Sequence, residues 1–202
     1  MSQCVTYIAY DGLYVNMTNR CSNDCDFCER NIIDSVGDAD SLWLEYEPSC
    51  QEVLASITEH DLNGFSELVF CGFGEPMMRA DDLLTVARHV KKAAPKLPIR
   101  INTNGHANLI TRRDITPDMS GVIDRLSVSL NRADEKAYTE HMRPDFGSEA
   151  FAGLLSFVEK AKKYVPDITL TALDLITPDE LTRCREIAEK LGVAFRVRAT
   201  NY

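Results

Sequence analysis

Short apolar segments alternate with helical periodicity along most of this chain, and this alternation limits the fold more than any other feature. Six of the apolar segments have strand character and begin near residues 13, 67, 98, 126, 168 and 194. Such alternation is typical of a parallel sheet whose right-handed crossovers place helices outside it. The sequence therefore predicts an α/β fold of six β/α units, and its periodicity fits an open sheet and a partial barrel equally.

Four segments have the apolar periodicity of helices. The first of these predicted helices starts at Pro48, and the other three cover residues 80–92, 148–164 and 178–191. Thr177 is the expected N-cap of the last helix, Pro178 its first residue and Gly192 its end. A weaker helical turn is expected after Gly105.

The N-terminal part predicts a hairpin and then a long loop. Two extended apolar segments, residues 5–10 and 13–17, are joined by an Asp11-Gly12 turn. Residues 31–47 have no clear period, so we expect a long loop there with at most a short helix. Because long loops in compact domains are commonly functional, this loop is a candidate lid.

Three cysteines directly follow the second of these strands. Three residues separate Cys21 from Cys25, and two separate Cys25 from Cys28. A loop at the end of the strand is expected to curl the three thiols around one point. Three thiolates on a [4Fe-4S] cube would leave one iron open, whereas four protein ligands use every iron.

Zinc and ordinary loop cysteines are the alternatives at this segment. Catalytic zinc also has three protein ligands and one open position, but it more often draws histidine. The four histidines are isolated along the chain, at His60, His89, His106 and His141. The remaining cysteines are not grouped and are expected to be small core or surface residues; they are Cys4, Cys50, Cys71 and Cys184.

Length and charge favour one domain without a nucleic acid partner. The 202 residues, 45% of them hydrophobic, suffice for one substantial core and are few for two. We therefore expect residues 1–202 to form a single domain. The 22 basic and 31 acidic residues give a formal net charge of -9, without a long basic block. Phosphate-backbone binding needs clustered positive charge, so nucleic acid is disfavoured.

The cysteine content and the N-terminus indicate a reducing compartment. Seven cysteines occur without a secretory leader, so we expect a cytoplasmic protein. No apolar run reaches the roughly 18 residues of a membrane span, and no membrane partner is expected.

Glycines and polar residues follow the next two strands, at the sheet edge where parallel α/β folds bind ligands. Gly72 and Gly74 would let a ligand approach the backbone, and Glu75 offers a carboxylate to an ammonium group. A tight turn accounts for these residues equally well. Turn propensity explains the Asn104-Gly105 pair after the third strand. It does not explain the polar pair before it, Asn102 and Thr103.

The fourth strand ends with alternating polar residues. Ser127, Ser129 and Asn131 point into a barrel if Val128 and Leu130 face the helices. They would then form an interior hydrogen-bond network or contact a ligand.

Two arginines share one face of the last strand, since Arg196 and Arg198 are at alternate positions. Either guanidinium suits a carboxylate, and Arg198 is the favoured ligand contact. A structural salt bridge or a solvent-facing edge is the alternative.

The cysteine segment resembles the signature of the radical S-adenosylmethionine (SAM) family, with an aromatic residue, Phe27, just before the last cysteine. The resemblance implies a partial (β/α)6 barrel and a [4Fe-4S] cluster on Cys21, Cys25 and Cys28. It also implies an oxygen-sensitive enzyme that reductively cleaves SAM to methionine and a 5′-deoxyadenosyl radical. That radical would abstract a hydrogen from a substrate, and the protein would bind, orient and shield.

The resemblance also implies the cofactor contacts. The segment around Gly74 and Glu75 is similar to the family's Gly-Gly-Glu-Pro segment, which contacts the SAM amino group; Phe73 departs from that pattern. Other contacts come from similar strand-end positions. The full implied set is Phe27, Gly72, Gly74, Glu75, Asn102, Thr103, Ser129, Asn131 and Arg198.

Within the family, the chain resembles the small TatD-nuclease-associated radical SAM proteins. This finer resemblance depends on residues 71–76, on the His-Met-Arg-Pro segment at 141–144 and on the Phe-Arg-Val-Arg ending at 195–198. The expected partners are an electron donor such as flavodoxin or ferredoxin and a small-molecule or protein/peptide substrate. A non-enzymatic iron-sulfur or zinc-binding module is the competing hypothesis, and it predicts metal binding without affinity for SAM.

Overall fold

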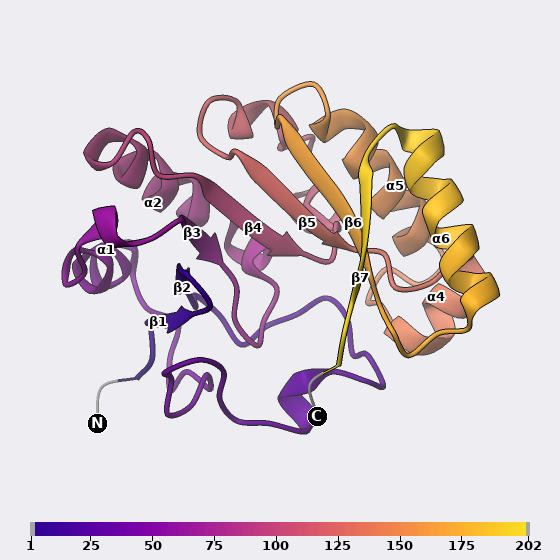
Figure 1. The fold of residues 1–202 in the computed structure, drawn as a ribbon, viewed down its shortest axis with the longest axis horizontal. Coiled ribbons are helices and arrows are strands. Elements are labelled where there is room, and N and C mark those ends of the chain that lie inside the picture. The colour runs from indigo at the N-terminus through magenta and orange to yellow at the C-terminus, as the bar shows by residue number, and fades with distance from the viewer. Residues whose placement is uncertain (1–2, 201–202) are drawn as a thin grey trace.

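The computed structural model describes residues 3–200, which contain a seven-stranded sheet covered by helices (Figure 1). The strands lie in the sheet in chain order; β1 is antiparallel to β2, and all other neighbours are parallel. They are β1 (Thr6–Ala9), β2 (Gly12–Val15), β3 (Glu67–Phe70), β4 (Ile99–Thr103), β5 (Arg125–Ser129), β6 (Asp167–Leu173) and β7 (Ala194–Arg198). The predicted α/β fold, the hairpin and the six core strands are confirmed.

Within residues 3–200, no pairing joins β1 to β7, so the sheet is open and the barrel is partial. The α-helices are α1 (Cys50–Thr58), α2 (Ala80–Ala93), α3 (Ala107–Thr111), α4 (Glu135–Met142), α5 (Glu149–Ala161) and α6 (Pro178–Leu191). Short 3-10 helices are η1 (Glu29–Asn31), η2 (Leu62–Gly64), η3 (Pro76–Arg79) and η4 (Thr116–Met119).

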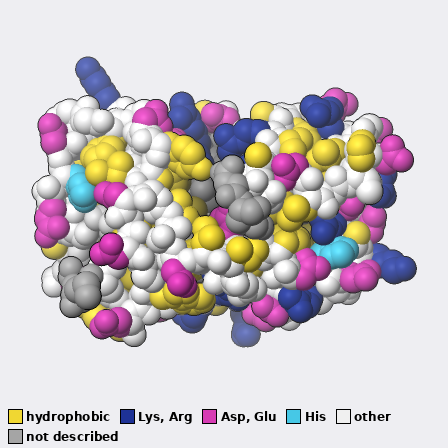
Figure 2. All heavy atoms as spheres, turned by 60° about the horizontal axis from the view of Figure 1, so that its bottom comes forward, with side chains coloured by type: hydrophobic (Ala, Val, Ile, Leu, Met, Phe, Trp, Pro, Cys, Tyr) yellow, Lys and Arg dark blue, Asp and Glu magenta, His cyan; other side chains and the backbone are white. Residues whose placement is uncertain are grey.

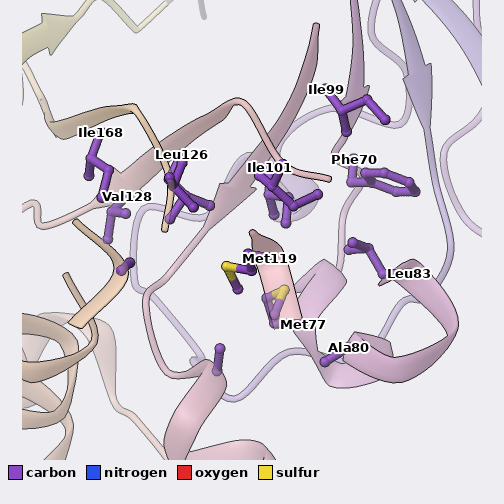
Figure 3. Close-up of a cluster of buried hydrophobic side chains, with 14 of the residues drawn as sticks. Phe70, Met77, Ala80, Leu83, Ile99, Ile101, Met119, Leu126, Val128 and Ile168 are labelled. Carbon is purple, nitrogen blue, oxygen red and sulfur yellow. The ribbon is translucent and has the colours of Figure 1, made fainter. Parts of the chain in front are cut away.

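Two apolar clusters hold the layers together, one on each face of the sheet. The larger fills the space between sheet and helices; Figure 3 shows Ile99 and Ile101 of β4 together with Phe70 of β3 and Leu83 of α2. All four side chains are fully buried. The smaller cluster lies on the other face and consists of Tyr7, Ala9, Tyr14, Leu42, Val69 and Phe73.

Local end signals account for where two helices begin and end. The Thr177 hydroxyl accepts a hydrogen bond from the Glu180 N–H, and Gly192 ends α6 with φ +67°, as predicted. Helix α1 begins two residues later than predicted. Its N-cap is Ser49, whose side chain accepts from the Glu52 N–H while the Glu52 carboxylate accepts from the Ser49 N–H. This capping box satisfies two N-terminal donors that Pro48 could not.

Helix α4 was not predicted. Its buried residues are only Tyr138 and Met142, too few for a clear apolar period in an eight-residue helix. The Asp134 carboxylate accepts from the Ala137 N–H and starts it. Arg143, in the left-handed conformation at φ 43°, ends it.

The long loop predicted at residues 31–47 is confirmed, and it is attached to the inner face of the sheet. The Asn16 side chain donates to the Leu42 carbonyl (2.8 Å), and the Asn19 side chain pairs with the Leu44 backbone (2.7 and 3.0 Å). Phe73 packs edge-on against Trp43 of this loop, with ring centroids 5.2 Å apart. The loop therefore forms a wall of the barrel interior.

Candidate functional site

The cysteine loop leaves the carboxyl end of β2 and brings three free, half-buried thiols into one region. Burial raises the pKa of the Cys21 thiol to about 12 and that of Cys25 to about 12, and negative charge on neighbouring thiols adds to both shifts. Among residues 3–200, however, no three potential metal-ligating side chains surround a single ion position. The expected gathering of the three thiols around one centre stays a prediction. A four-iron cube needs less convergence, because each cysteine binds a different iron.

A second segment of backbone fixes the shape of this loop. Residues 22–26 run antiparallel to residues 141–145, through four backbone hydrogen bonds or bridges. The His141 ring lies 2.8 Å from the Asp26 carboxylate, and Arg143 donates to the Asp24 carbonyl (2.6 Å). The His-Met-Arg-Pro segment that the sequence singled out thus positions the cysteine loop.

A buried hydrogen-bond network lies directly behind Cys21. The His106 ring bonds the Ser22 hydroxyl through Nδ1 (3.2 Å) and the Tyr138 hydroxyl through Nε2 (3.0 Å), and Asn104 donates to Ser22 (2.9 Å). Burial lowers the pKa of His106 to about 4, so the ring is neutral near pH 7. The sequence analysis missed this network; its only local signal was a histidine shortly after the predicted Asn102-Thr103 contact.

Two N–H groups point at the Cys21 sulfur. The Asn23 backbone N–H lies 3.4 Å from Sγ, and the Asn104 side-chain amide lies 3.9 Å from it. Hydrogen bonds to sulfur favour the thiolate and tune the potential of an iron-sulfur cluster. The surroundings of Cys21 therefore suit a metal-bound thiolate.

Glu75 is buried, with 3% of its surface exposed. Its carboxylate accepts from the Met77 N–H (3.0 Å), the Thr103 hydroxyl (2.8 Å) and the Asn104 N–H (2.6 Å). Burial raises the pKa of Glu75 to about 7, although all three hydrogen bonds lower it. Because Glu75 N–H also donates to the Arg20 carbonyl, this residue joins the β3 end, the β4 end and the cysteine loop.

Gly72 and Gly74 are required by the protein's own packing. A Cβ at Gly72 would lie 2.1 Å from the Asn16 side-chain oxygen, and one at Gly74 would lie 2.2 Å from the Thr18 carbonyl. The sequence analysis expected a ligand to approach the backbone of these glycines closely. In the structure, Asn16 and Thr18, which lead into the cysteine loop, occupy that space.

A cavity of about 610 Å³ occupies the inner face of the sheet beside the cysteine loop. Its walls include Tyr14 of β2, Ser127 of β5 and residues 33–42 of the long loop, and Glu29, next to Cys28, lies at one side. Arg100 crosses the inner face and pairs with Glu67 (2.7 Å).

Several predicted contacts lie in or near this cavity, and others do not. Asn102 lines it and accepts from Arg100 (2.6 Å), whereas Thr103 is buried and bonds Glu75. Arg198, the favoured ligand contact on the last strand, also lines the cavity.

Gly72 also lines the cavity, whereas Phe27, Gly74, Glu75, Ser129 and Asn131 do not. Ser129 is half-buried at the end of β5. Asn131, at φ 55°, accepts from the Leu173 N–H (3.3 Å). Phe27 lies under the Arg132 guanidinium, 5.3 Å from the ring centroid. None of these positions tests SAM binding, so the cofactor contacts stay predictions.

Comparison with known proteins gives consistent results. A sequence profile described as the radical SAM superfamily matches residues 15–191. GTP 3′,8-cyclase from Paenarthrobacter nicotinovorans is 28% identical over 145 residues, which cover 69% of this chain and 37% of the cyclase. The chain thus spans little more than a third of that curated relative.

Solved structures share the fold. A radical SAM methyltransferase from Sphaerobacter thermophilus has a TM-score of 0.62 at 14% identity, covering 98% of this chain and 69% of that one. Streptococcus suis SuiB bound to S-adenosylmethionine has a TM-score of 0.63 at 16% identity, covering 98% and 39%. Within residues 3–200, none of the helices has the length and apolar character that a membrane crossing needs.

Proposed function

The chain belongs to the radical SAM superfamily, and from that premise we propose that it uses a [4Fe-4S] cluster to cleave SAM reductively and to abstract a hydrogen from a substrate. Membership and the relatives make it an enzyme of SAM-dependent radical chemistry. The finer resemblance to TatD-nuclease-associated proteins stays a prediction.

The cysteine loop fits such a cluster. Cys21, Cys25 and Cys28 are free and half-buried in one loop, and two N–H groups point at the Cys21 sulfur. This donor set is the observation that carries the proposal, because three thiolates leave the fourth iron for a ligand. When bound and reduced, the cluster supplies the electron that splits SAM into methionine and a 5′-deoxyadenosyl radical.

The chain's own residues position this chemistry. Glu75 and the Ser22-His106-Tyr138 network hold the cysteine loop against the ends of β3 and β4. We assign SAM to the carboxyl edge of the sheet beside this loop. The contacts assigned to it are the backbone near Phe27, Gly72 and Gly74, the Glu75 carboxylate, to which Thr103 donates, and the side chains of Asn102, Ser129 and Asn131.

The cavity on the inner face is the proposed substrate site, with residues 33–42 as part of its wall. Asn16 and Asn19 hold this wall in place through hydrogen bonds to the Leu42 and Leu44 carbonyls. A small molecule, or one side chain of a peptide, suits a cavity of this size.

An external one-electron donor is needed, and we propose flavodoxin or ferredoxin for this role. Seven free cysteines agree with a reducing cytoplasm, which we propose as the compartment. The non-enzymatic module proposed as an alternative has no support among the relatives, which are enzymes.

The test is anaerobic reconstitution with iron and sulfide, followed by reductant and SAM and by quantification of 5′-deoxyadenosine. Cys25→Ala is expected to lose the cluster's absorbance and to form no 5′-deoxyadenosine. Cys50→Ala, outside the loop, is the matched control and should retain both. An intact reduced cluster that forms no product, with or without added cell metabolites, contradicts the proposal.

A further inference from the structure

Two guanidinium groups on the last strand face the inner cavity. Arg196 and Arg198 are alternate residues of β7 and both line the cavity. Their neighbours across the sheet are Thr171 and Leu173 of β6, which carry no charge. Successive residues of a strand rise about 3.3 Å, so the two Cα atoms are about 7 Å apart on one face. This spacing places two positive charges in one concave site.

Neither guanidinium has a carboxylate partner within residues 3–200, whereas the other arginine in the cavity does. Arg100 is bound by Glu67 (2.7 Å) and also donates to Asn102 and Tyr14. The formal charge of the chain is -9, so acidic partners are abundant elsewhere. The β7 pair is thus unneutralised in a chain that pairs many of its other arginines.

Two of the three acidic residues of the cavity lie away from this pair or are already paired. Glu67 is neutralised by Arg100 and Arg125 (3.3 Å). Asp11 lies in the turn that begins β2, at the opposite end of the strands from Arg198, the last residue of β7. The third, Glu29, begins η1 directly after Cys28. At the carboxyl end of the strands, the cavity is thus lined by two basic side chains of β7 and one acidic side chain, Glu29. Figure 2 shows Lys and Arg side chains among acidic and apolar ones on one face of the molecule.

Guanidinium groups bind carboxylates and phosphates through two parallel hydrogen bonds, and this match gives both affinity and orientation. We propose that the substrate carries a carboxylate or phosphate group and that Arg196 and Arg198 bind this oxyanion at the carboxyl end of β7. The inference rests on the proposed function, since it names the substrate class of the same site. SAM also carries a carboxylate, and the sequence analysis expected Arg198 to contact it, so the test separates these two sources.

The test measures equilibrium binding by calorimetry to the cluster-loaded chain without reductant, at constant ionic strength. The probes are inorganic phosphate and succinate, each added to protein saturated with SAM, and SAM alone. The variants are Arg196→Gln, Arg198→Gln and the double variant. Arg88→Gln is the matched control, because it removes the same charge from an exposed position on α2.

The expected result is that the double variant binds phosphate or succinate about 10- to 100-fold more weakly, as for the loss of charge-assisted hydrogen bonds. Its affinity for SAM should change by less than about threefold, on the same conversion of free energy to affinity. Arg88→Gln should match wild type. Preference for phosphate over succinate identifies the kind of oxyanion.

Two results overturn the inference. The first is an oxyanion affinity that is absent in wild type or equal in the double variant. The second is a loss of SAM affinity with oxyanion binding unchanged, which assigns the pair to the cofactor. Because no reductant is present, these outcomes do not depend on 5′-deoxyadenosine formation, and failure of the proposed radical chemistry is recognised separately.

Discussion

Two buried titrating groups beside the cysteine loop should oppose each other in the pH dependence of stability. Burial raises the pKa of Glu75 from its ordinary 4.5 to about 7, and burial lowers the pKa of His106 from 6.5 to about 4. At pH values between 4.5 and 7, the folded chain keeps a proton on Glu75 that the unfolded chain releases. At pH values between 4 and 6.5, conversely, the unfolded chain binds a proton on His106 that the folded chain does not bind.

The signs and sizes follow from proton linkage. As pH rises from 5 to 7, the Glu75 term lowers the free energy of unfolding by about 2 kcal/mol, because the buried carboxyl must ionise. Over the same range the His106 term raises it by about 2 kcal/mol, because the cost of excluding a proton disappears. The two contributions nearly cancel in the wild-type protein.

Single substitutions should therefore reveal opposite slopes. Between pH 5 and pH 7, the free energy of unfolding of Glu75→Gln should rise by about 2 kcal/mol relative to wild type. That of His106→Gln should fall by about 2 kcal/mol relative to wild type over the same range. Each variant also carries a constant loss from its altered hydrogen bonds, so the slope is the informative quantity. The assay is urea denaturation monitored by Trp43 fluorescence, with equal iron content in all samples. If the Glu75→Gln curve runs parallel to the wild-type curve, the carboxyl is not protonated in the folded chain and the reasoning fails.

Two further predictions concern the packing of the cysteine loop. Gly74→Ala places a Cβ 2.2 Å from a backbone carbonyl, so it should lower the free energy of unfolding by more than about 2 kcal/mol and reduce iron loading. Gly64→Ala, whose Cβ would have no neighbour within 4 Å, is the control and should change neither. Equal urea midpoints for the two variants would refute this packing role. Tyr138→Phe leaves the buried His106 Nε2 without its partner and should cost about 1–3 kcal/mol by urea denaturation, and an unchanged midpoint would show that the hydroxyl does not stabilise the network.

Local patterns in the sequence predicted most of the framework. The six core strands were predictable because runs such as Leu68-Val69-Phe70 are apolar on both faces, and α6 because both of its ends have strong capping residues. The position of the cysteine loop followed from the strand before it.

Interactions between distant segments were not predictable. The glycines at 72 and 74 look the same in sequence whether a ligand or the chain itself approaches them. The contacts of His106 come from residues 84 and 32 positions away, and no local period encodes them. For the same reason the sequence placed Asn102 and Thr103 in one site, although the pleat of β4 directs them to opposite faces.

The antiparallel pairing of residues 22–26 with residues 141–145 also has a consequence for the order of folding. The cysteine loop is synthesised early, but its backbone partners follow about 120 residues later. Closing so long a loop has an entropic cost that only the contacts of the folded barrel offset. We therefore expect the loop to be ordered late, after β5 and α4 have formed. Cluster insertion would then act on a nearly complete chain, and a nascent chain that ends before Asp145 would present flexible, unprotected thiols.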